Sequence, residues 1–354
     1  MRKNVLCMNK NFNKSQRSHF HLCLDIISKF HALEEKSYHT LRQGSTDISK
    51  QQQNKPRCPL TGTIKLVSTS GEQINLVIHK VLGMGTGSVV YLGEIDGSQC
   101  VAKQLYPELL NNEALIEGTS HGLTVCGSVR AQKRWRQRKN EFLKSFKMQG
   151  KLSSIPSLAG FIQPVCGIYL SGDTICMISK SFVGYSWEKQ QDCSIDELIE
   201  IIIKIAHVVQ CINEYGFLVV DIKPSNFVVS VDSNRSVVVD LIDFGSIAKR
   251  HSWEKYKYSS ETAPKEYKSK HRKNVGTWSE VYCVVAMFTD RLFGHHNTKI
   301  IHGDLSAICK SKYREWVYKH QSILEYIIIR GLDDNISTRF QTCKDLIYYM
   351  NMLR

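Results

Sequence analysis

The sequence has no apolar run as long as a membrane span requires, which is about 18 residues in succession. The best candidate, residues 198–212, is interrupted by Glu200 and Lys204. The apolar start of the chain gives way to Asn9-Lys10-Asn11, which is too soon for a secretion signal. We therefore expect a cytoplasmic or nuclear protein without a membrane span.

The 12 cysteines include no pair spaced as Cys-x-x-Cys, and their positions match no zinc-site pattern. A chain of 354 residues can also bury enough apolar surface to fold without disulfides. Neither a zinc-binding fold nor a disulfide scaffold is indicated. We expect the reduced thiols of an intracellular protein.

Acidic residues are scarce: 33 Asp and Glu stand against 47 Lys and Arg, for a formal net charge of +14. The excess gathers in residues 1–57, with 11 basic and 4 acidic residues, and in the cluster 130–139. Such segments attract acidic protein surfaces or polyanions. A solvated surface is the plainer interpretation, because Trp135 alone within 130–139 is a weak sign of nucleic-acid binding.

Composition divides the chain at about residue 60. Residues 1–60 are expected to form a basic tail or linker, in which 20–41 has apolar residues spaced as in one amphipathic helix. Residues 61–354 are expected to form one α+β domain with two lobes. The first lobe, about 61–184, should be a small antiparallel β lobe with one main helix, and the second, about 185–354, mostly helical. A cleft between such lobes would suit a ligand.

Alternation and periodicity predict the elements of this domain. In the first lobe we expect strands at 63–67, 74–78 and 100–105, two strands around a glycine-rich turn within 81–95, a helix at 132–151, and strands at 159–170 and 174–183. Residues 106–130 show little periodicity and are interpreted as an insertion. In the second lobe we expect helices at 195–215 and 279–293, with short apolar strands around Asp221 and Asp243.

The first motif that could carry chemistry is the glycine-rich turn with Gly83, Gly85 and Gly87. Glycine lets backbone amides approach phosphate oxygens without a Cβ clash. Lys103 follows on the next apolar strand, and its ammonium suits the α- and β-phosphates of a nucleotide. Alone, a glycine-rich hairpin is more often just a turn.

The second and third motifs contain carboxylates. In Asp221-Ile222-Lys223-Pro224-Ser225-Asn226, the carboxylate can accept a hydroxyl proton, the lysine can hold a γ-phosphate and the amide oxygen can bind a metal. Asp243, in Asp243-Phe244-Gly245, ends an apolar strand and suits Mg²⁺. Each could be structural, because Asp starts turns and Asn caps helices. Their order in one chain favours function.

With the motifs in this order, residues 61–354 resemble the eukaryotic-type protein kinases, and Lys223 is similar to the lysine of the Ser/Thr-specific subgroup. The resemblance implies a protein-kinase-like fold, ATP with Mg²⁺ (or Mn²⁺), and phosphate transfer to hydroxyls of protein substrates. It implies that Lys103 pairs with ATP phosphates and with a helix glutamate, for which Glu141 is the candidate. The implied catalytic set is Asp221, Lys223, Lys103 and Glu141, the implied metal ligands are Asn226 and Asp243, and the implied nucleotide-binding residues are Leu82, Gly83, Gly85, Gly87, Val90, Ala102 and Lys103.

Several positions depart from the family pattern. Ser88 replaces the third loop glycine, and Val219-Val220 replace the His-Arg pair before the catalytic aspartate. Because that arginine gathers a phosphorylated activation loop, its loss predicts activity that does not depend on the phosphate. Glu280 stands where the family has an aspartate that anchors the catalytic loop.

The Ala-Pro-Glu element of the family has the form Ala263-Pro264-Lys265-Glu266. Either Lys265 replaces the glutamate, or the register shifts by one and leaves Glu266 in that role, with Arg339 as its partner. These departures keep a second function open, a pseudokinase that binds ATP or serves as a scaffold. A small-molecule phosphotransferase and a tyrosine kinase fit the motifs less well.

Overall fold

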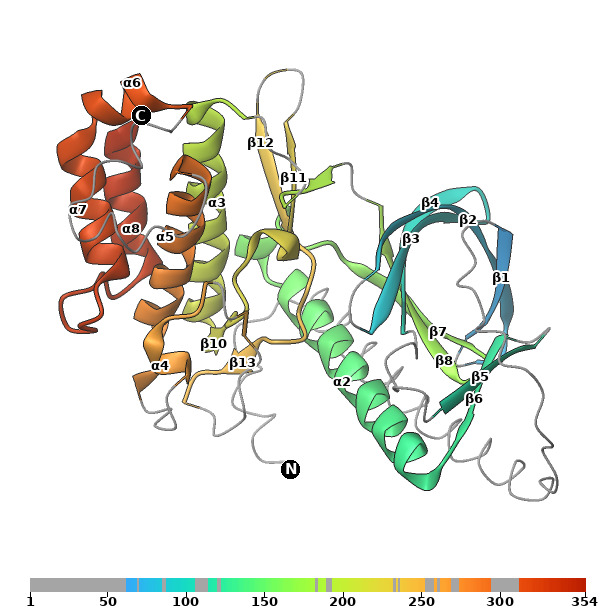
Figure 1. Cartoon of the computed structure of the whole chain (residues 1–354). Coiled ribbons are helices and arrows are strands. Elements are labelled where there is room, and N and C mark those ends of the chain that lie inside the picture. The colour runs from blue at the N-terminus through green and yellow to red at the C-terminus, as the bar shows by residue number, and fades with distance from the viewer. Residues whose placement is uncertain are drawn as a thin grey trace. The chain divides into compact units, whose positions relative to one another are not determined.

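The computed structural model describes residues 62–68, 70–84, 87–105, 114–119, 122–181, 184–188, 193–231, 234, 236–251, 258–259, 262–268, 274–293 and 312–354. These residues form two compact units (Figure 1). The first contains the described residues up to Ile155 and those from Gln163 to Ser181, and the second contains Pro156–Ile162 and those from Gly184 onward. The predictions for residues 1–60 and for Gly85 lie outside the described residues.

Six strands of the first unit form a closed antiparallel barrel in the order β1-β2-β3-β4-β8-β7. Their bounds are Gly62–Val67 (β1), Gln73–Met84 (β2), Ser88–Ile95 (β3), Ser98–Leu105 (β4), Val165–Ser171 (β7) and Thr174–Lys180 (β8). The expected hairpin pairs β1 with β2, and Val67 opposite Leu170 closes the barrel between β1 and β7.

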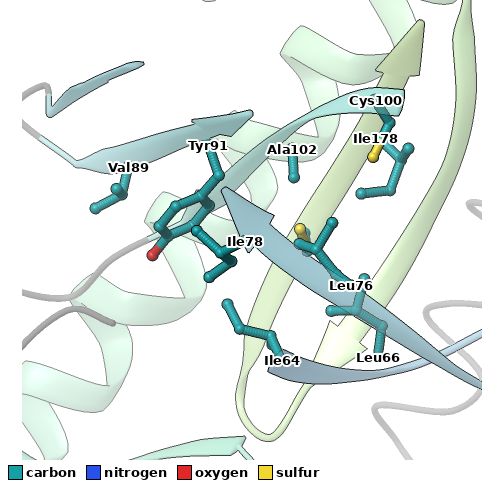
Figure 2. Packing of buried hydrophobic residues seen from close by; sticks show 10 residues of the cluster. Ile64, Leu66, Leu76, Ile78, Val89, Tyr91, Cys100, Ala102 and Ile178 are labelled. Carbon is teal, nitrogen blue, oxygen red and sulfur yellow. The ribbon is translucent and has the colours of Figure 1, made fainter. Parts of the chain in front are cut away.

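The interior of the barrel is filled by alternate residues of its strands (Figure 2). Leu66 and Leu76 are fully buried there, and Ala102 lies on the same inner face of β4 as Cys100. Side chains on one face of a strand recur with a period of two. Lys103 and Leu105 therefore lie on the outer face of β4.

One long helix, α2 (Val129–Ser153), covers outer-face residues of the barrel. Its Phe142 and Phe146 pack in one cluster with Leu105, Ile168 and Met177. The segment interpreted as an insertion contains a further hairpin that the periodicity did not predict, of β5 (Ala114–Thr119) and β6 (Gly122–Gly127).

The second unit is mostly helical, and α3, α5, α7 and α8 pack against one another (Figure 1). The helices are α3 (Ile195–Glu214), α4 (Lys265–Lys268), α5 (Thr277–Phe293), α6 (Arg314–Lys319), α7 (Gln321–Leu332) and α8 (Cys343–Met350). The strands are β9 (Tyr185–Ser186), β10 (Phe217–Leu218), β11 (Phe227–Val231), β12 (Val237–Leu241) and β13 (Ala248–Lys249), and single 3₁₀ turns occupy Pro156–Leu158, Pro224–Asn226 and Asn351–Leu353.

Helix α3 forms the centre of this unit because its sequence provides both a cap and an apolar face. Ser194 and Glu197 form a capping box, in which each side chain accepts a hydrogen bond from the other residue's backbone N–H. Ile201, Ile205 and Val208 are among its fully buried side chains. The predicted α+β class is confirmed, with antiparallel strands first and helices after them. None of the described helices is long and apolar enough to cross a membrane.

Candidate functional site

Two loops of the second unit carry four of the predicted site residues. The loop 219–226 connects β10 to β11, and the loop 242–247 connects β12 to β13. Strand β10 pairs with β13, and β11 pairs with β12. The two strands that flank the first loop are therefore paired with the two strands that flank the second. Ile242 N–H continues the second ladder by donating to the Asn226 carbonyl at 3.0 Å. The ladders thus bring Asp221, Lys223, Asn226 and Asp243 to neighbouring loops.

A strained turn precedes Asp221. Val220 has a φ of 66°, and the Asp221 N–H donates to the Val219 carbonyl at 2.9 Å. This is the hydrogen-bond pattern and φ of the rare, strained form of γ-turn. A β-branched residue at positive φ costs free energy, on the order of 1–3 kcal/mol. Surrounding contacts must therefore hold the turn.

Glu280, on α5, provides the main contact. Its carboxylate accepts the Val220 N–H at 2.8 Å and a hydrogen bond from Nδ2 of Asn213, on α3. The side chain is fully buried, and desolvation raises the pKa of Glu280 to about 7, while the donors and the Arg250 guanidinium act in the opposite direction. The glutamate thus anchors the backbone just before Asp221, from the position where the family has an aspartate.

The two carboxylate oxygens of Asp221 are in different environments. Oδ2 lies 2.8 Å from Lys223 Nζ and 3.2 Å from Asn226 Nδ2. Oδ1 is buried and has no hydrogen-bond partner among the described residues. A buried acceptor without a partner costs free energy and in a native fold calls for an explanation. The side chain as a whole is 14% exposed, so part of this fixed carboxylate other than Oδ1 is open to solvent.

Asn226 and Asp243 carry the kinds of oxygen that suit a metal ion. Asn226 Nδ2 donates to the Asp221 carbonyl at 2.7 Å as well as to Oδ2, which leaves its amide oxygen without a partner among the described residues. Asp243 Oδ1 accepts the Gly245 N–H at 3.1 Å, so its carboxylate is held in a tight turn. Amide and carboxylate oxygens are the ligands that Mg²⁺ prefers. The residues present therefore fit the implied metal, although no cluster of three or more His, Cys, Asp or Glu that could hold an ion occurs in the described part of the chain.

The first unit carries the other predicted residues. Lys103 pairs with Met177 in the sheet and lies on the outer face of β4, the face on which Leu105 and Met177 pack against α2. Glu141 lies on α2, beside the buried Phe142, where Gln137 Nε2 donates to it at 3.3 Å and Arg138 lies 3.9 Å away. Lys103 and Glu141 thus lie on a strand and a helix that pack against each other.

The predicted nucleotide-binding residues lie on three consecutive strands of the barrel. Leu82 and Gly83 are on β2, Val90 is on β3, and Ala102 is on β4, with Gly87 immediately before β3. Val90 pairs directly with Lys103. A Cβ atom added at Gly83 or Gly87 would meet no atom within 4 Å, so both glycines border open space.

Comparison with solved structures identifies the architecture. The chain is similar to the PknI kinase domain of Mycobacterium tuberculosis: two double-mutant forms match with TM-scores of 0.50 and 0.51 at 13% and 15% sequence identity, and a further crystal structure with a TM-score of 0.50 at 14%. Each match covers 78% of this chain and 95% of the other. This is a protein-kinase-like fold. No protein-family model matches the chain, and no curated protein matches it in sequence.

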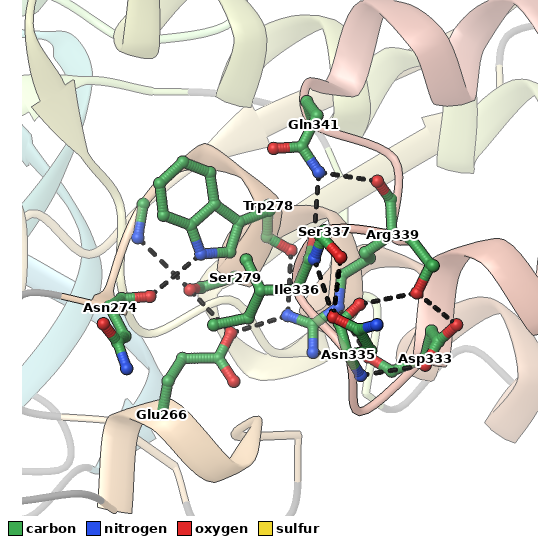
Figure 3. A network of polar contacts seen from close by, with 12 residues as sticks. Glu266, Asn274, Trp278, Ser279, Asp333, Asn335, Ile336, Ser337, Arg339 and Gln341 are labelled. Carbon is green, nitrogen blue, oxygen red and sulfur yellow. Dashed lines mark hydrogen bonds and ion pairs between the residues drawn. The ribbon is translucent and has the colours of Figure 1, made fainter.

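Within the protein-kinase-like fold, a buried ion pair decides between the two registers left open by Ala263-Pro264-Lys265-Glu266 (Figure 3). Arg339 Nη1 donates to Glu266 Oε1 at 2.6 Å, and both side chains are at least 95% buried. Ser279 Oγ donates to the same oxygen at 2.8 Å. Lys265 is exposed and contacts Asp334. Glu266, and not Lys265, therefore forms the buried ion pair with Arg339 that the shifted register predicts.

Sequence patterns missed the side chains that support the loop 219–226. Asn213 belongs to the apolar periodicity of α3, and its Nδ2 also donates to the Phe217 carbonyl at 3.0 Å. Thr262, buried, donates from Oγ1 to the Ile222 carbonyl at 2.9 Å, and Ser246 Oγ donates to the Val219 carbonyl at 3.1 Å. Only the polar character of Asn213 within an apolar helix face could have drawn attention to it.

The aromatic residue in the basic segment of α2 is not available to nucleic acid. Trp135 is 96% buried, and Lys139 Nζ lies 5.9 Å from the centre of its ring. The exposed cations of the segment are Arg130, Lys133, Arg136 and Arg138. A base cannot stack on a buried ring, which removes the main support for nucleic-acid binding.

Proposed function

We propose that this chain is a protein kinase that transfers the γ-phosphoryl group of ATP to serine or threonine hydroxyls. The observation that carries the proposal is the fixed carboxylate of Asp221. Its Oδ2 is held by Lys223 and Asn226, Glu280 anchors the loop just before it, and the side chain is 14% exposed. A carboxylate that is held in one orientation and still open to solvent is suited to orienting a hydroxyl group and receiving its proton.

Other residues have roles in binding and charge neutralisation. Lys103 would bind the α- and β-phosphates of ATP and pair with Glu141, while the glycine-rich strands would cover the nucleotide. Asn226 and Asp243 would hold Mg²⁺, which supplies charge neutralisation of the phosphates when bound. Lys223, 2.8 Å from Asp221, would stabilise negative charge on the transferred group.

Precise placement of Asp221 depends on side chains that hold the backbone of its loop. Glu280 holds the Val220 N–H, Asn226 holds the Asp221 carbonyl and Thr262 holds the Ile222 carbonyl. Phosphoryl transfer relies mainly on positioning and electrostatics, so such support contributes directly to the rate. Lys223 is also the residue that favours Ser/Thr acceptors over Tyr acceptors.

The decisive experiment compares Asp221→Asn with the wild-type chain in labelled-phosphate incorporation, into both protein substrates and the chain itself. We expect turnover to fall by about 10²- to 10⁴-fold, because the proton acceptor is removed, while thermal stabilisation by Mg·ATP persists. Asp196→Asn, an exposed residue in the first turn of α3, is the matched control.

Each result of that experiment distinguishes the alternatives. Nucleotide stabilisation without incorporation in the wild-type chain would identify a pseudokinase. Phosphotyrosine as the main product would overturn the Ser/Thr assignment. Incorporation that Asp221→Asn leaves unchanged would remove Asp221 from the mechanism.

The exposed cations of α2 provide a second, independent surface. Arg130, Lys133, Arg136 and Arg138 would attract an acidic partner rather than nucleic acid, because the neighbouring Trp135 is buried. Exposed charges act through a screened field, so any such binding should weaken steeply with salt.

A further inference from the structure

The segment after the catalytic loop has an unusual surface. Within residues 262–268 the buried side chains are Thr262, Ala263, Pro264, Glu266 and Tyr267, and the exposed ones are Lys265 and Lys268. Every exposed side chain of this stretch is therefore a lysine. Three residues apart on the single turn of α4, the two lysines share a face.

Buried contacts fix this face close to Asp221. Thr262 Oγ1 donates at 2.9 Å to the carbonyl of Ile222, the residue between Asp221 and Lys223. Three residues span at most about 11 Å of chain, and one helical turn adds about 5 Å. Measured along the chain, Lys265 and Lys268 thus lie within about 16 Å of Thr262, the residue that is hydrogen-bonded to the catalytic loop.

Neighbouring acidic groups do not neutralise this face. Glu266 is buried and paired with Arg339. Lys265 contacts Asp334, but both side chains are more than half exposed, and such ion pairs are weak and easily exchanged. Lys249, also exposed, lies on β13, which directly follows the loop 242–247. In sequence, residues 249–273 contain nine lysines and arginines and three acidic residues.

We propose that the acceptor serine or threonine lies in an acidic peptide, with Asp or Glu within about five residues of the hydroxyl. This inference rests on the proposed function, since it assumes that the hydroxyl reaches the carboxylate of Asp221. An extended peptide advances about 3.4 Å per residue. Side chains up to five positions from the acceptor can therefore reach Lys265 and Lys268, which attract carboxylates and repel basic sequences.

The test uses the full chain with Mg·ATP and three peptides that share one serine and differ in three flanking positions, filled by Glu, Gln or Lys. We expect kcat/KM to be about 5- to 30-fold higher for the Glu peptide than for the Gln peptide at low salt, which corresponds to a few weak exposed ion pairs. The difference should shrink in 0.5 M salt, and the Lys peptide should be the poorest substrate.

Two double variants locate the preference. Lys265→Glu with Lys268→Glu should abolish or reverse it, whereas Lys319→Glu with Lys344→Glu makes the same charge change on exposed lysines of α6 and α8 and should preserve it. Lys265→Gln with Lys268→Gln is a milder pair if charge reversal impairs folding. Equal kcat/KM for the Glu and Gln peptides, or equal losses in both double variants, would overturn the inference.

A separate readout distinguishes this inference from the proposed function. Binding of the same three peptides, labelled with a fluorophore, is measured by anisotropy in the presence of Mg·ATP. If no peptide is phosphorylated but the Glu peptide binds best through Lys265 and Lys268, the kinase proposal fails while the acidic-peptide surface stands. If the peptides are phosphorylated without any acidic preference, the kinase proposal stands while the acidic-peptide surface fails.

Discussion

Lys103 lies on a regular strand of a closed barrel, whereas Asp221 lies on an irregular loop held by side chains from two helices. On the barrel, backbone hydrogen bonds between strands fix where each side chain points. On the loop, the buried Glu280 and Asn213 replace such a ladder, and a strained turn at Val220 is the cost. Hydrogen bonds between strands hold the backbone along a whole strand, whereas a buried polar side chain fixes the backbone at one position.

Because they are held in different ways, the two units should respond differently to mutation. Substitutions in the barrel should change stability by adding or removing packed side-chain volume. Changes around the loop should act through unpaired buried polar groups, whose desolvation is costly in a low-dielectric interior. Four variants test this contrast.

The largest effect is expected from Arg339→Leu. The change leaves the buried Glu266 carboxylate without its cationic partner, which should lower the free energy of unfolding by about 3–5 kcal/mol. Lys265→Met is the matched control, because it breaks an exposed pair with Asp334 and should cost less than about 1 kcal/mol. Urea unfolding of both variants provides the measurement, and equal losses would contradict the assignment of Glu266.

Glu280→Gln should alter how stability depends on pH. The pKa of Glu280 is raised from 4.5 to about 7, so between these values the folded chain holds a proton that the unfolded chain has released. Stability from this group is present below pH 4.5 and is lost as the pH rises to 7, by about 3 kcal/mol at most. Glutamine does not titrate, and its amide oxygen can still accept the Val220 N–H.

The measurement is urea unfolding from pH 5 to pH 8, with the exposed Glu214→Gln as control. The decline in stability across this range should be shallower in Glu280→Gln and unchanged in the control. A Glu280→Gln slope identical to that of the wild-type chain would mean that the carboxyl does not titrate here.

In the barrel, Gly93→Ala should be destabilising by about 1–3 kcal/mol through overpacking. A Cβ atom at this position would lie 2.6 Å from the Val77 carbonyl oxygen and 2.8 Å from Leu76 Cδ1. Gly83→Ala, which meets no atom within 4 Å, is the control. Thermal unfolding followed by circular dichroism checks the pair, and a stable Gly93→Ala would show that β2 and β3 can separate at little cost.

The smallest effect concerns strain at Val220. Val220→Gly removes a buried side chain, which lowers the free energy of unfolding. Glycine also adopts positive φ freely, so relief of strain should offset about 1–2 kcal/mol of that loss. Val239→Gly, in β12, loses a side chain of the same size without such recovery. The measured difference between the two variants gives the strain, and a Val220→Gly loss as large as the control's would argue against it.

Regular elements could be predicted from the sequence because their periodicity reflects burial. The apolar spacing over 195–215 predicted α3, which ends at Glu214, and the alternation over 63–67 and 74–78 predicted the first hairpin. The hairpin of β5 and β6 was missed, since residues 106–130 show little periodicity. Its bounds, Ala114–Thr119 and Gly122–Gly127, fall within that stretch.

The site was predictable only in part. Asp221, Lys223, Asn226 and Asp243 were selected by motif, and the two strand ladders bring their loops together. Contacts that depend on distant segments could not be predicted in the same way. The hydrogen bond from Val220 to Glu280 joins residues 60 positions apart, and no local pattern encodes that separation.

The way β1 joins the barrel has a consequence for how this protein behaves at high concentration. Strand β1 pairs with β2 along its whole length but with β7 only at Val67 and Leu170, so the ladder that closes the barrel is one residue pair long. Deleting β1 would uncover the row of N–H and C=O groups on β2, which another chain can pair with. The shortened protein should then be prone to association by strand addition, a hazard that β1 removes at this edge.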